Sequence, residues 1–159
     1  MGHIAITGAA AGIGAACVTR LMAAGHQVTA FDIIEPAGVD NWVAVDMGDL
    51  ASVAAAAEQV EGPFDALINN AGLPPKDDNA AEILAVNVLG LRAFNDALLP
   101  RLANGAAIVS TASRAGQAWA ENIDEVKALL ALESREIWPV SSKHAGLTRC
   151  APIACRKRR

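Results

Sequence analysis

Tyrosine is absent from the 159-residue chain, and aromatic residues of all kinds make up only 4% of it. Without tyrosine the chain has no phenol to donate or accept a proton. With so few rings we expect no aromatic surface for nucleic acid or carbohydrate. The apolar content, 53% of the residues, is carried by Ala, Val, Ile and Leu. This composition suits helices packed closely on a sheet, in one domain that can bury a core.

Cysteine is also scarce: Cys17, Cys150 and Cys155 match no metal-binding spacing. The apolar start of the chain has no basic leader and is interrupted by glycines, so we predict no secretory signal. An odd number of cysteines without such a signal fits reduced thiols. No uninterrupted apolar run is long enough to span a bilayer. We therefore expect a cytoplasmic protein with neither a metal nor a membrane partner.

The formal net charge of −4 is unevenly distributed. Residues 1–148 hold eight of the 13 basic residues and all 17 acidic ones, a net charge of −9. A surface this acidic argues against a nucleic-acid partner. Residues 149–159 are basic and lose helical periodicity, because Pro152 breaks a helix interior. We expect one domain over 1–148 followed by an aberrant, solvated basic tail over 149–159.

What the chain does have is a glycine-rich turn directly after the apolar run His3–Ile6. Gly8 permits the tight turn, Gly12 allows the backbone to approach a ligand, and Gly14 lets the following helix pack on the strand. The backbone N–H groups at the start of that helix can hold a pyrophosphate without any cationic side chain. The motif alone leaves an ordinary tight turn open.

Strand and helix patterns alternate along the rest of the chain. Gly25 predicts the end of the first helix, Asp49 predicts an N-cap, and Gly90 predicts close packing within a long helix. The order predicts an α/β fold, a Rossmann-type doubly wound parallel sheet with helices on both faces. The expected strands are 3–6, 27–31, 42–45, 64–68 and 106–109; the expected helices are 13–24, 49–60, 80–102 and 120–132.

Polar residues stand at the ends of these strands, where ligands bind in such sheets. Asp32 follows Gly14 by 18 positions, a spacing at which a carboxylate accepts hydrogen bonds from the adenosine ribose. A turn former or helix cap is the alternative for this residue. No Arg or Lys lies within 8–15 or just after Asp32, so we predict NAD rather than NADP as the cofactor. The strand-end residues are Thr7, Asp32, Asp46, Asn69, Asn70 and 110–113.

Five segments together resemble the short-chain dehydrogenase/reductase family over about residues 3–148. They are Thr7-Gly-x-x-x-Gly-Ile-Gly14, Asp46-Met47, Asn69-Asn-Ala-Gly72, Asn87 and Ile108-Val-Ser-Thr-Ala-Ser113. The short stretch from Gly72 to Asn87 and the added helical sequence 120–132 are similar to the hydroxysteroid dehydrogenase/carbonyl reductase branch. The resemblance implies that Asp46 bonds the adenine amino group and that 70–72 lines the ribose channel. The cofactor residues so implied are Gly8, Ala11, Gly12, Ile13, Gly14, Asp32, Asp46, Met47, Asn70, Ala71, Gly72 and Lys143.

The resemblance also implies a catalytic set of Ser, Tyr, Lys and Asn, of which Ser113, Lys143 and Asn87 match. Ser113 would orient the substrate oxygen, Lys143 would lower the pKa of the Tyr and hold the nicotinamide ribose, and Asn87 would anchor a water. A loop hydroxyl, a solvated lysine and a polar helix face are the respective alternatives. The family's Tyr is replaced by Trp138, five positions before Lys143 because of one extra Ser. An indole cannot shuttle a proton, and we expect no rescue by Ser141, Ser142 or His144.

Two functions follow from these observations. The first is an NAD(H)-dependent oxidoreductase that interconverts a secondary alcohol and a ketone, such as a hydroxysteroid. The alternative is a non-catalytic NAD-binding remnant, inactive because the Tyr and the last strands are missing. We hypothesise that the reading frame shifted between Trp138 and Arg149, which would truncate the enzyme. A homo-oligomer is compatible with the resemblance, although the second helix through which relatives assemble would be curtailed.

Overall fold

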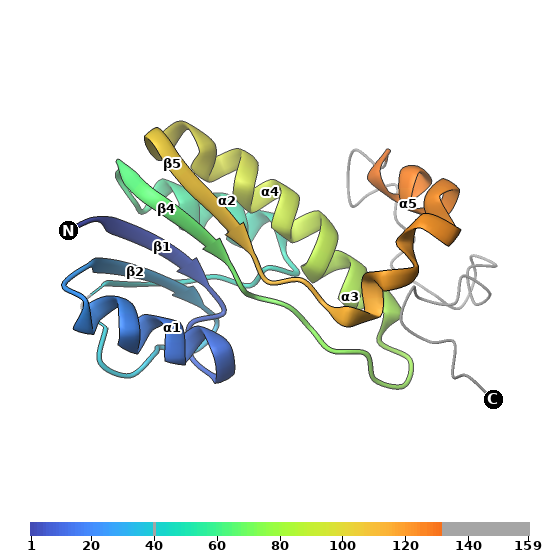
Figure 1. Ribbon diagram of the computed structural model, residues 1–159, viewed down its shortest axis with the longest axis horizontal. Coiled ribbons are helices and arrows are strands. Elements are labelled where there is room, and N and C mark those ends of the chain that lie inside the picture. The colour runs from blue at the N-terminus through green and yellow to red at the C-terminus, as the bar shows by residue number, and fades with distance from the viewer. Residues whose placement is uncertain (40, 132–159) are drawn as a thin grey trace.

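Five parallel strands form one sheet in the computed structural model, which describes residues 1–39 and 41–131. The strand order is β3-β2-β1-β4-β5, so the chain starts in the middle and winds outward to each edge in turn (Figure 1). This arrangement confirms the predicted Rossmann-type sheet. The strands are β1 (His3–Thr7), β2 (Gln27–Asp32), β3 (Asn41–Ala44), β4 (Phe64–Asn69) and β5 (Leu102–Ser110).

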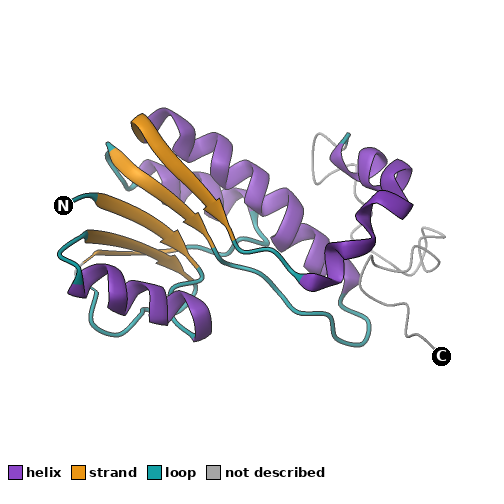
Figure 2. Ribbon diagram, viewed as in Figure 1, coloured by secondary structure: helices purple, strands orange, loops and turns teal. Residues whose placement is uncertain are grey.

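Helices lie on both faces of the sheet (Figure 2). On one face is α1 (Gly12–Ala23); on the other are α2 (Leu50–Glu58) and a long helical run. A 3₁₀ segment, η3 (Arg114–Asn122), and α5 (Ile123–Leu130) lie beyond the carboxyl ends of the strands (Figure 1). The long run consists of α3 (Ala80–Leu84), the π-helical turn η1 (Ala85–Gly90), α4 (Leu91–Leu98) and the 3₁₀ turn η2 (Leu99–Arg101).

Three residues predicted to cap, end or closely pack a helix have these roles in the structure. The Asp49 side chain caps α2 by accepting a hydrogen bond from the Ala51 N–H at 3.0 Å. Gly25 has a φ of +82° just after α1, a conformation that L side chains rarely adopt. A Cβ atom on Gly90 would collide with the Met47 carbonyl oxygen, so the long helix can approach the loop after β3 only with glycine there.

The core has one layer on each side of the sheet. Between the sheet and α2 and α4, the rings of Phe31 and Phe94 meet edge to face with centroids 4.9 Å apart. Under α1, Val18 packs with Ile6 and Val28. By length and composition alone the run Ala80–Arg101 could cross a membrane, but Phe94 within it is fully buried in this core. One side of the run, which includes Phe94 and Leu98, packs in the core of the sheet.

The structure corrects the predicted boundaries around β5. The long helix ends at Arg101, and β5 begins at Leu102 rather than at 106, because its register on β4 shifts near the start. Leu102 pairs with Phe64 and Ala107 pairs with Ala66, so residues 103–106 lie opposite a single β4 residue. Helical structure after β5 likewise begins at Arg114, earlier than the predicted 120.

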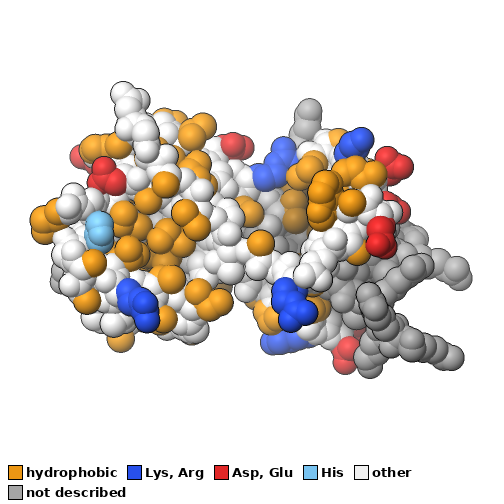
Figure 3. Space-filling model, in the orientation of Figure 1, with side chains coloured by type: hydrophobic (Ala, Val, Ile, Leu, Met, Phe, Trp, Pro, Cys, Tyr) orange, Lys and Arg blue, Asp and Glu red, His pale blue; other side chains and the backbone are white. Residues whose placement is uncertain are grey.

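The half of the sheet that α1 leaves open carries hydrophobic side chains (Figure 3). Ile108 and Val109, successive residues of β5, are 48% and 54% exposed. Successive strand residues point to opposite faces. Within the described residues, β5 is therefore only partly covered on both faces.

The pKa of His3 on β1 predicts a pH-dependent stability. Its imidazole Nε2 lies 2.8 Å from the Thr29 hydroxyl and its ring packs on Phe64. Burial lowers the pKa of His3 below 6.5, and the charge of Asp65 only partly opposes this. The unfolded chain therefore binds a proton at a higher pH than the folded protein, so stability falls as pH drops from 6.5 to the lowered value.

We expect the urea midpoint of the His3→Gln variant to fall less than that of the wild type across this window. Glutamine keeps a polar group near Thr29 but does not titrate. Unfolding curves at neutral pH and at mildly acidic pH measure the difference. An equal fall in both proteins would contradict the assignment.

Candidate functional site

The polar strand-end residues of the sequence do meet at one edge of the sheet. Thr7, Asp32, Asn69 and Ser110 are the last residues of β1, β2, β4 and β5. All four strands run in parallel, so these ends lie together at the carboxyl edge (Figure 1). This edge is where sheets of this type bind ligands.

In the glycine turn between β1 and α1, two glycines have no room for a side chain and the third faces open space. A Cβ on Gly8 would lie 2.7 Å from the Ala71 Cα, and one on Gly14 would collide with the Gly8 carbonyl oxygen. A Cβ on Gly12 would meet no atom within 4 Å, and the φ of Gly12 is +56°. Gly8 and Gly14 therefore serve packing, whereas Gly12 borders free space.

The first turn of α1 is open to a ligand. Ala11, its N-cap residue, has an extended backbone and no side-chain cap, and the first turn carries no acidic residue. Ala11, Gly12 and Ile13 are all exposed, with Ile13 at 64%. Uncapped N–H groups at a helix start attract anions such as phosphate. The turn has the backbone geometry that the sequence predicted for a pyrophosphate.

The Asp32 carboxylate is fixed beside this turn. Its Oδ2 accepts a hydrogen bond from the Ala10 N–H at 2.8 Å, and its Oδ1 accepts one from the Ile34 N–H at 3.2 Å. The Trp42 indole N–H donates to the Asp32 carbonyl oxygen at 3.1 Å. Each carboxylate oxygen keeps acceptor capacity for a further hydroxyl. Asp32 thus combines the predicted turn role with the ability to bind a sugar.

Thr7 and Asn70 tie the strand ends together. The Thr7 Oγ1 accepts hydrogen bonds from the N–H groups of Asn70 and Ala71, both at 3.1 Å. The Asn70 amide donates to the Gly8 carbonyl oxygen at 2.9 Å and accepts from the Thr111 hydroxyl at 3.1 Å. The Asn70 side chain therefore holds the glycine turn in place and links it to the end of β5.

A second polar group lies just beneath the edge. The Asn69 amide nitrogen donates to Asn95 Oδ1 at 3.0 Å and to Ser110 Oγ at 3.4 Å. Asn69 is only 4% exposed, and its Oδ1 has no hydrogen-bond partner within the described residues. Sequence analysis missed Asn95, because nothing in the local pattern of the helix marks a residue whose partner is 26 positions away.

After β3, Asp46 stabilises a turn and Met47 packs in the core. The Asp46 Oδ1 accepts a hydrogen bond from the Gly48 N–H at 2.7 Å, and the carboxylate is exposed. The Met47 side chain is buried in the core on the α2 side. Of the two, Asp46 can offer its side chain to a ligand, whereas Met47 can offer only its backbone.

Asn87 is held by the loop that follows Gly72. Its Oδ1 accepts from the Leu73 N–H at 2.8 Å, and its Nδ2 donates to the Leu73 carbonyl oxygen at 3.0 Å. Asn87 lies inside the π-helical turn, a feature often found at functional sites. Its amide retains one N–H and one lone pair for a water. Asn87 thus lies on a polar face of the helical run that contacts the loop after Gly72.

Ser113 follows β5 and caps η3. Its exposed Oγ accepts a hydrogen bond from the Ala115 N–H at 3.1 Å, and the hydroxyl hydrogen has no described acceptor. The hydroxyl can therefore still donate to a ligand atom. Lys143 and Trp138, together with Ser141, Ser142 and His144, lie outside the described residues.

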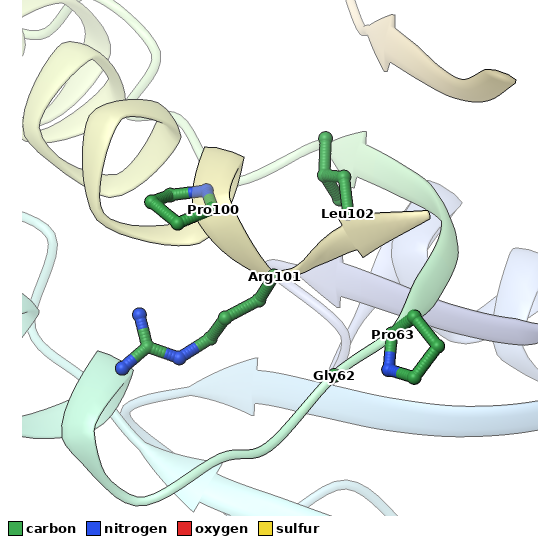
Figure 4. Close-up of a pocket in the computed structure, with 5 residues that line it drawn as sticks. All are labelled: Gly62, Pro63, Pro100, Arg101 and Leu102. Atoms are coloured by element: carbon green, nitrogen blue, oxygen red, sulfur yellow. The ribbon is translucent and has the colours of Figure 1, made fainter. Parts of the chain in front are cut away.

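A hollow of about 190 Å³ lies at the other end of β4 and β5 (Figure 4). It is lined by Gly62, Pro63, Pro100, Arg101 and Leu102. The Arg101 guanidinium there donates to the carbonyl oxygens of Val60 and Ala97 at 3.0 and 2.7 Å. This arginine links the end of the long helical run to the segment between α2 and β4, and none of the predicted site residues lines the hollow.

Comparisons with known proteins agree with this geometry. The short chain dehydrogenase family model matches residues 2–123. The chain is 29% identical to a 3-alpha-hydroxysteroid dehydrogenase/carbonyl reductase of Comamonas testosteroni, over 99% of this chain and 66% of that protein. It spans 46% to 66% of the length of the four curated relatives that it matches.

Two solved structures share the fold. A short chain dehydrogenase family protein from Francisella tularensis superposes with a TM-score of 0.68 at 25% identity, covering 74% of this chain and 53% of that one. A Brucella ovis oxidoreductase of the short chain dehydrogenase/reductase family, in complex with a partially ordered NAD, gives a TM-score of 0.63 at 24% identity. That match covers 80% of this chain and 74% of the Brucella chain.

Proposed function

The chain belongs to the short-chain dehydrogenase family, and from that premise we propose that it binds NAD(H) for hydride transfer between a secondary alcohol and a ketone. The observation that carries the proposal is the open space at Gly12 between an uncapped helix start and a fixed carboxylate. Backbone donors there suit a diphosphate, and the carboxylate suits a ribose.

The residues present fit this cofactor. Gly8, Gly12 and Gly14 shape the turn, with Ala11 and Ile13 flanking the phosphate position. Asp32 would hold the adenosine ribose and Asp46 the adenine amino group, while 70–72 and the Met47 backbone would border the cofactor channel. When bound, NAD would supply the hydride acceptor or donor. Lys143, by the family resemblance, would hold the nicotinamide ribose.

NAD is favoured over NADP by charge. The Asp32 carboxylate would accept hydrogen bonds from the ribose hydroxyls and repel a 2′-phosphate. Residues 8–15 and the positions just after Asp32 contain no Arg or Lys to neutralise such a phosphate. The Brucella ovis structure, a similar protein, contains NAD.

On the substrate side, Ser113 would donate its free hydroxyl hydrogen to the alcohol or ketone oxygen. Asn87 would hold a water through the one N–H and the one lone pair of its amide that are not bonded to Leu73. A hydroxysteroid is one candidate substrate, because the Comamonas relative acts in that class by name. The position of the family's Tyr is taken by Trp138, which cannot transfer a proton.

The absence of tyrosine specifically supports a second candidate, NAD binding without turnover. Calorimetric titration with NADH and NADPH, beside a steady-state assay on small ketones and keto-steroids, separates the two. Binding of NADH with turnover supports the oxidoreductase. Binding without turnover supports the second candidate, and no binding of either cofactor refutes both.

We expect Asp32→Ala to weaken NADH binding by roughly 10- to 100-fold, the value of about one hydrogen bond to a charged group. Glu35→Ala is the matched control, because Glu35 is an exposed carboxylate three positions further on that makes no described contact with the glycine turn. Calorimetry measures both variants. Equal NADH affinity of Asp32→Ala and Glu35→Ala would contradict the assignment of Asp32.

A further inference from the structure

The start of β5 contains a bulge with two exposed residues that the proposed function does not use. Residues 103–106 lie opposite the single β4 residue Asp65, because the register shifts between the pairs Phe64–Leu102 and Ala66–Ala107. Asn104 and Gly105 are exposed within it, and Gly105 has a φ of +83°. A Cβ on Gly105 would meet no atom within 4 Å. The backbone here is open to solvent on the outer edge of the sheet.

We propose that Asn104 is a site of spontaneous deamidation. The Gly105 backbone nitrogen attacks the Asn104 Cγ, and the proton that it loses is transferred through water to the side-chain nitrogen. The bond from Cγ to that nitrogen then breaks, and ammonia leaves. The resulting five-membered succinimide is opened by water at either carbonyl, which gives aspartate or isoaspartate. Water is the sole co-reactant, and no atom is oxidised or reduced.

Two features single out this residue among the asparagines. Asn104-Gly105 is the one Asn-Gly pair in the sequence, and glycine offers neither a side chain to obstruct ring closure nor a narrow range of φ. Within the described residues the Asn104 carboxamide makes no hydrogen bond. Six other asparagine side chains are hydrogen bonded: Asn69, Asn70, Asn79, Asn87, Asn95 and Asn122.

Deamidation would place a new carboxylate in the bulge opposite Asp65. The Asp65 carboxylate accepts a hydrogen bond from the His3 N–H at 2.7 Å, so the change falls where β1 and β4 begin. Isoaspartate would also route the main chain through the former side chain. The glycine turn is at the other end of the strands, so NADH affinity should not change.

The experiment follows the tryptic peptide 102–114 after incubation of the folded chain at mildly alkaline pH. We expect this peptide to gain about one mass unit at least tenfold faster than the peptides holding Asn79 and Asn122, since ring closure is an intramolecular reaction that glycine favours. Protein isoaspartyl methyltransferase identifies the isoaspartate product. The same rate at all three asparagines would overturn the proposal.

Two comparisons test the structural part of the argument. Asn104→Gln should abolish the mass change at this position, because a longer side chain closes the ring poorly. The synthetic peptide 102–114 gives the unconstrained rate, and we expect the folded chain to react within about threefold of it, as an exposed bulge outside the regular strand pairing should. A rate more than about tenfold slower in the folded chain would show that β5 protects Asn104 and would overturn the proposal.

Discussion

Replacing Gly14 with Ala should cost the chain its stable fold, whereas replacing Gly12 with Ala should leave the fold and remove NADH binding. A Cβ on Gly14 collides with the Gly8 carbonyl oxygen and lies 2.7 Å from the Asn70 amide nitrogen. Neither neighbour can move freely, because Gly8 and Asn70 are hydrogen bonded to other strand ends. Overpacking typically costs about 1–3 kcal/mol and more where backbone blocks the new atom, as it does here, which is a large part of a small domain's stability.

The Gly12 variant meets no such obstacle within the protein. Its cost is the left-handed backbone conformation, roughly 1–2 kcal/mol for a residue with a Cβ. That Cβ, however, would occupy the open space beside the first turn of α1, where the diphosphate is proposed to lie. Folding without NADH binding is therefore the expected result for Gly12→Ala.

Urea unfolding and calorimetric titration measure the two effects separately. Gly116→Ala is the matched control, because a Cβ there meets no atom within 4 Å and its φ is not positive. If Gly14→Ala unfolds at the same urea concentration as the control, the packing argument fails. If Gly12→Ala binds NADH as tightly as the control, the diphosphate does not lie at this turn.

The second large effect is on turnover. We expect Trp138→Tyr combined with deletion of Ser142 to raise ketone reduction by about 10²- to 10⁴-fold, the usual contribution of a general acid. Tyrosine supplies a phenolic proton that an indole cannot. The deletion places Tyr four residues before the lysine now numbered Lys143, a spacing at which helical side chains lie on one face. The measurement is steady-state NADH oxidation with a ketone.

Two variants control this experiment. Trp138→Phe with the same deletion removes the indole without adding a hydroxyl, so it should stay at the rate of the starting chain. Trp138→Tyr without the deletion keeps the five-residue spacing and should gain less. Equal rates for the Tyr and Phe double variants would mean that no proton passes through this position.

Local chemistry made much of the fold predictable. The Asp49 cap, the glycine after α1 and the close approach at Gly90 each depend on residues a few positions away or on the absence of a side chain. The alternation of strands and helices predicted a parallel sheet covered by helices on both faces. It did not predict the strand order, which depends on pairing between strands that are distant in the sequence. The early start of β5 was missed, because a register shift depends on the partner strand.

The site was less predictable than the fold for the same reason. Sequence spacing predicted Asp32 as a ribose ligand but not its bond to the Ala10 N–H, which fixes the carboxylate beside the turn. Asn87 was expected in a plain helix and lies instead in a π-helical turn, bonded to Leu73. Asn95 was not identified, because its partner Asn69 comes from a distant strand.

The indole of Trp42 gives the molecule its own optical probe. Its N–H is bonded to the carbonyl oxygen of Asp32, and the ring is 36% exposed. Indole emission overlaps the absorption of reduced nicotinamide, so an excited Trp42 can transfer its energy to NADH bound nearby. Occupancy of the sugar position can thus be followed without a label, and Trp42→Phe separates this signal from those of Trp119 and Trp138.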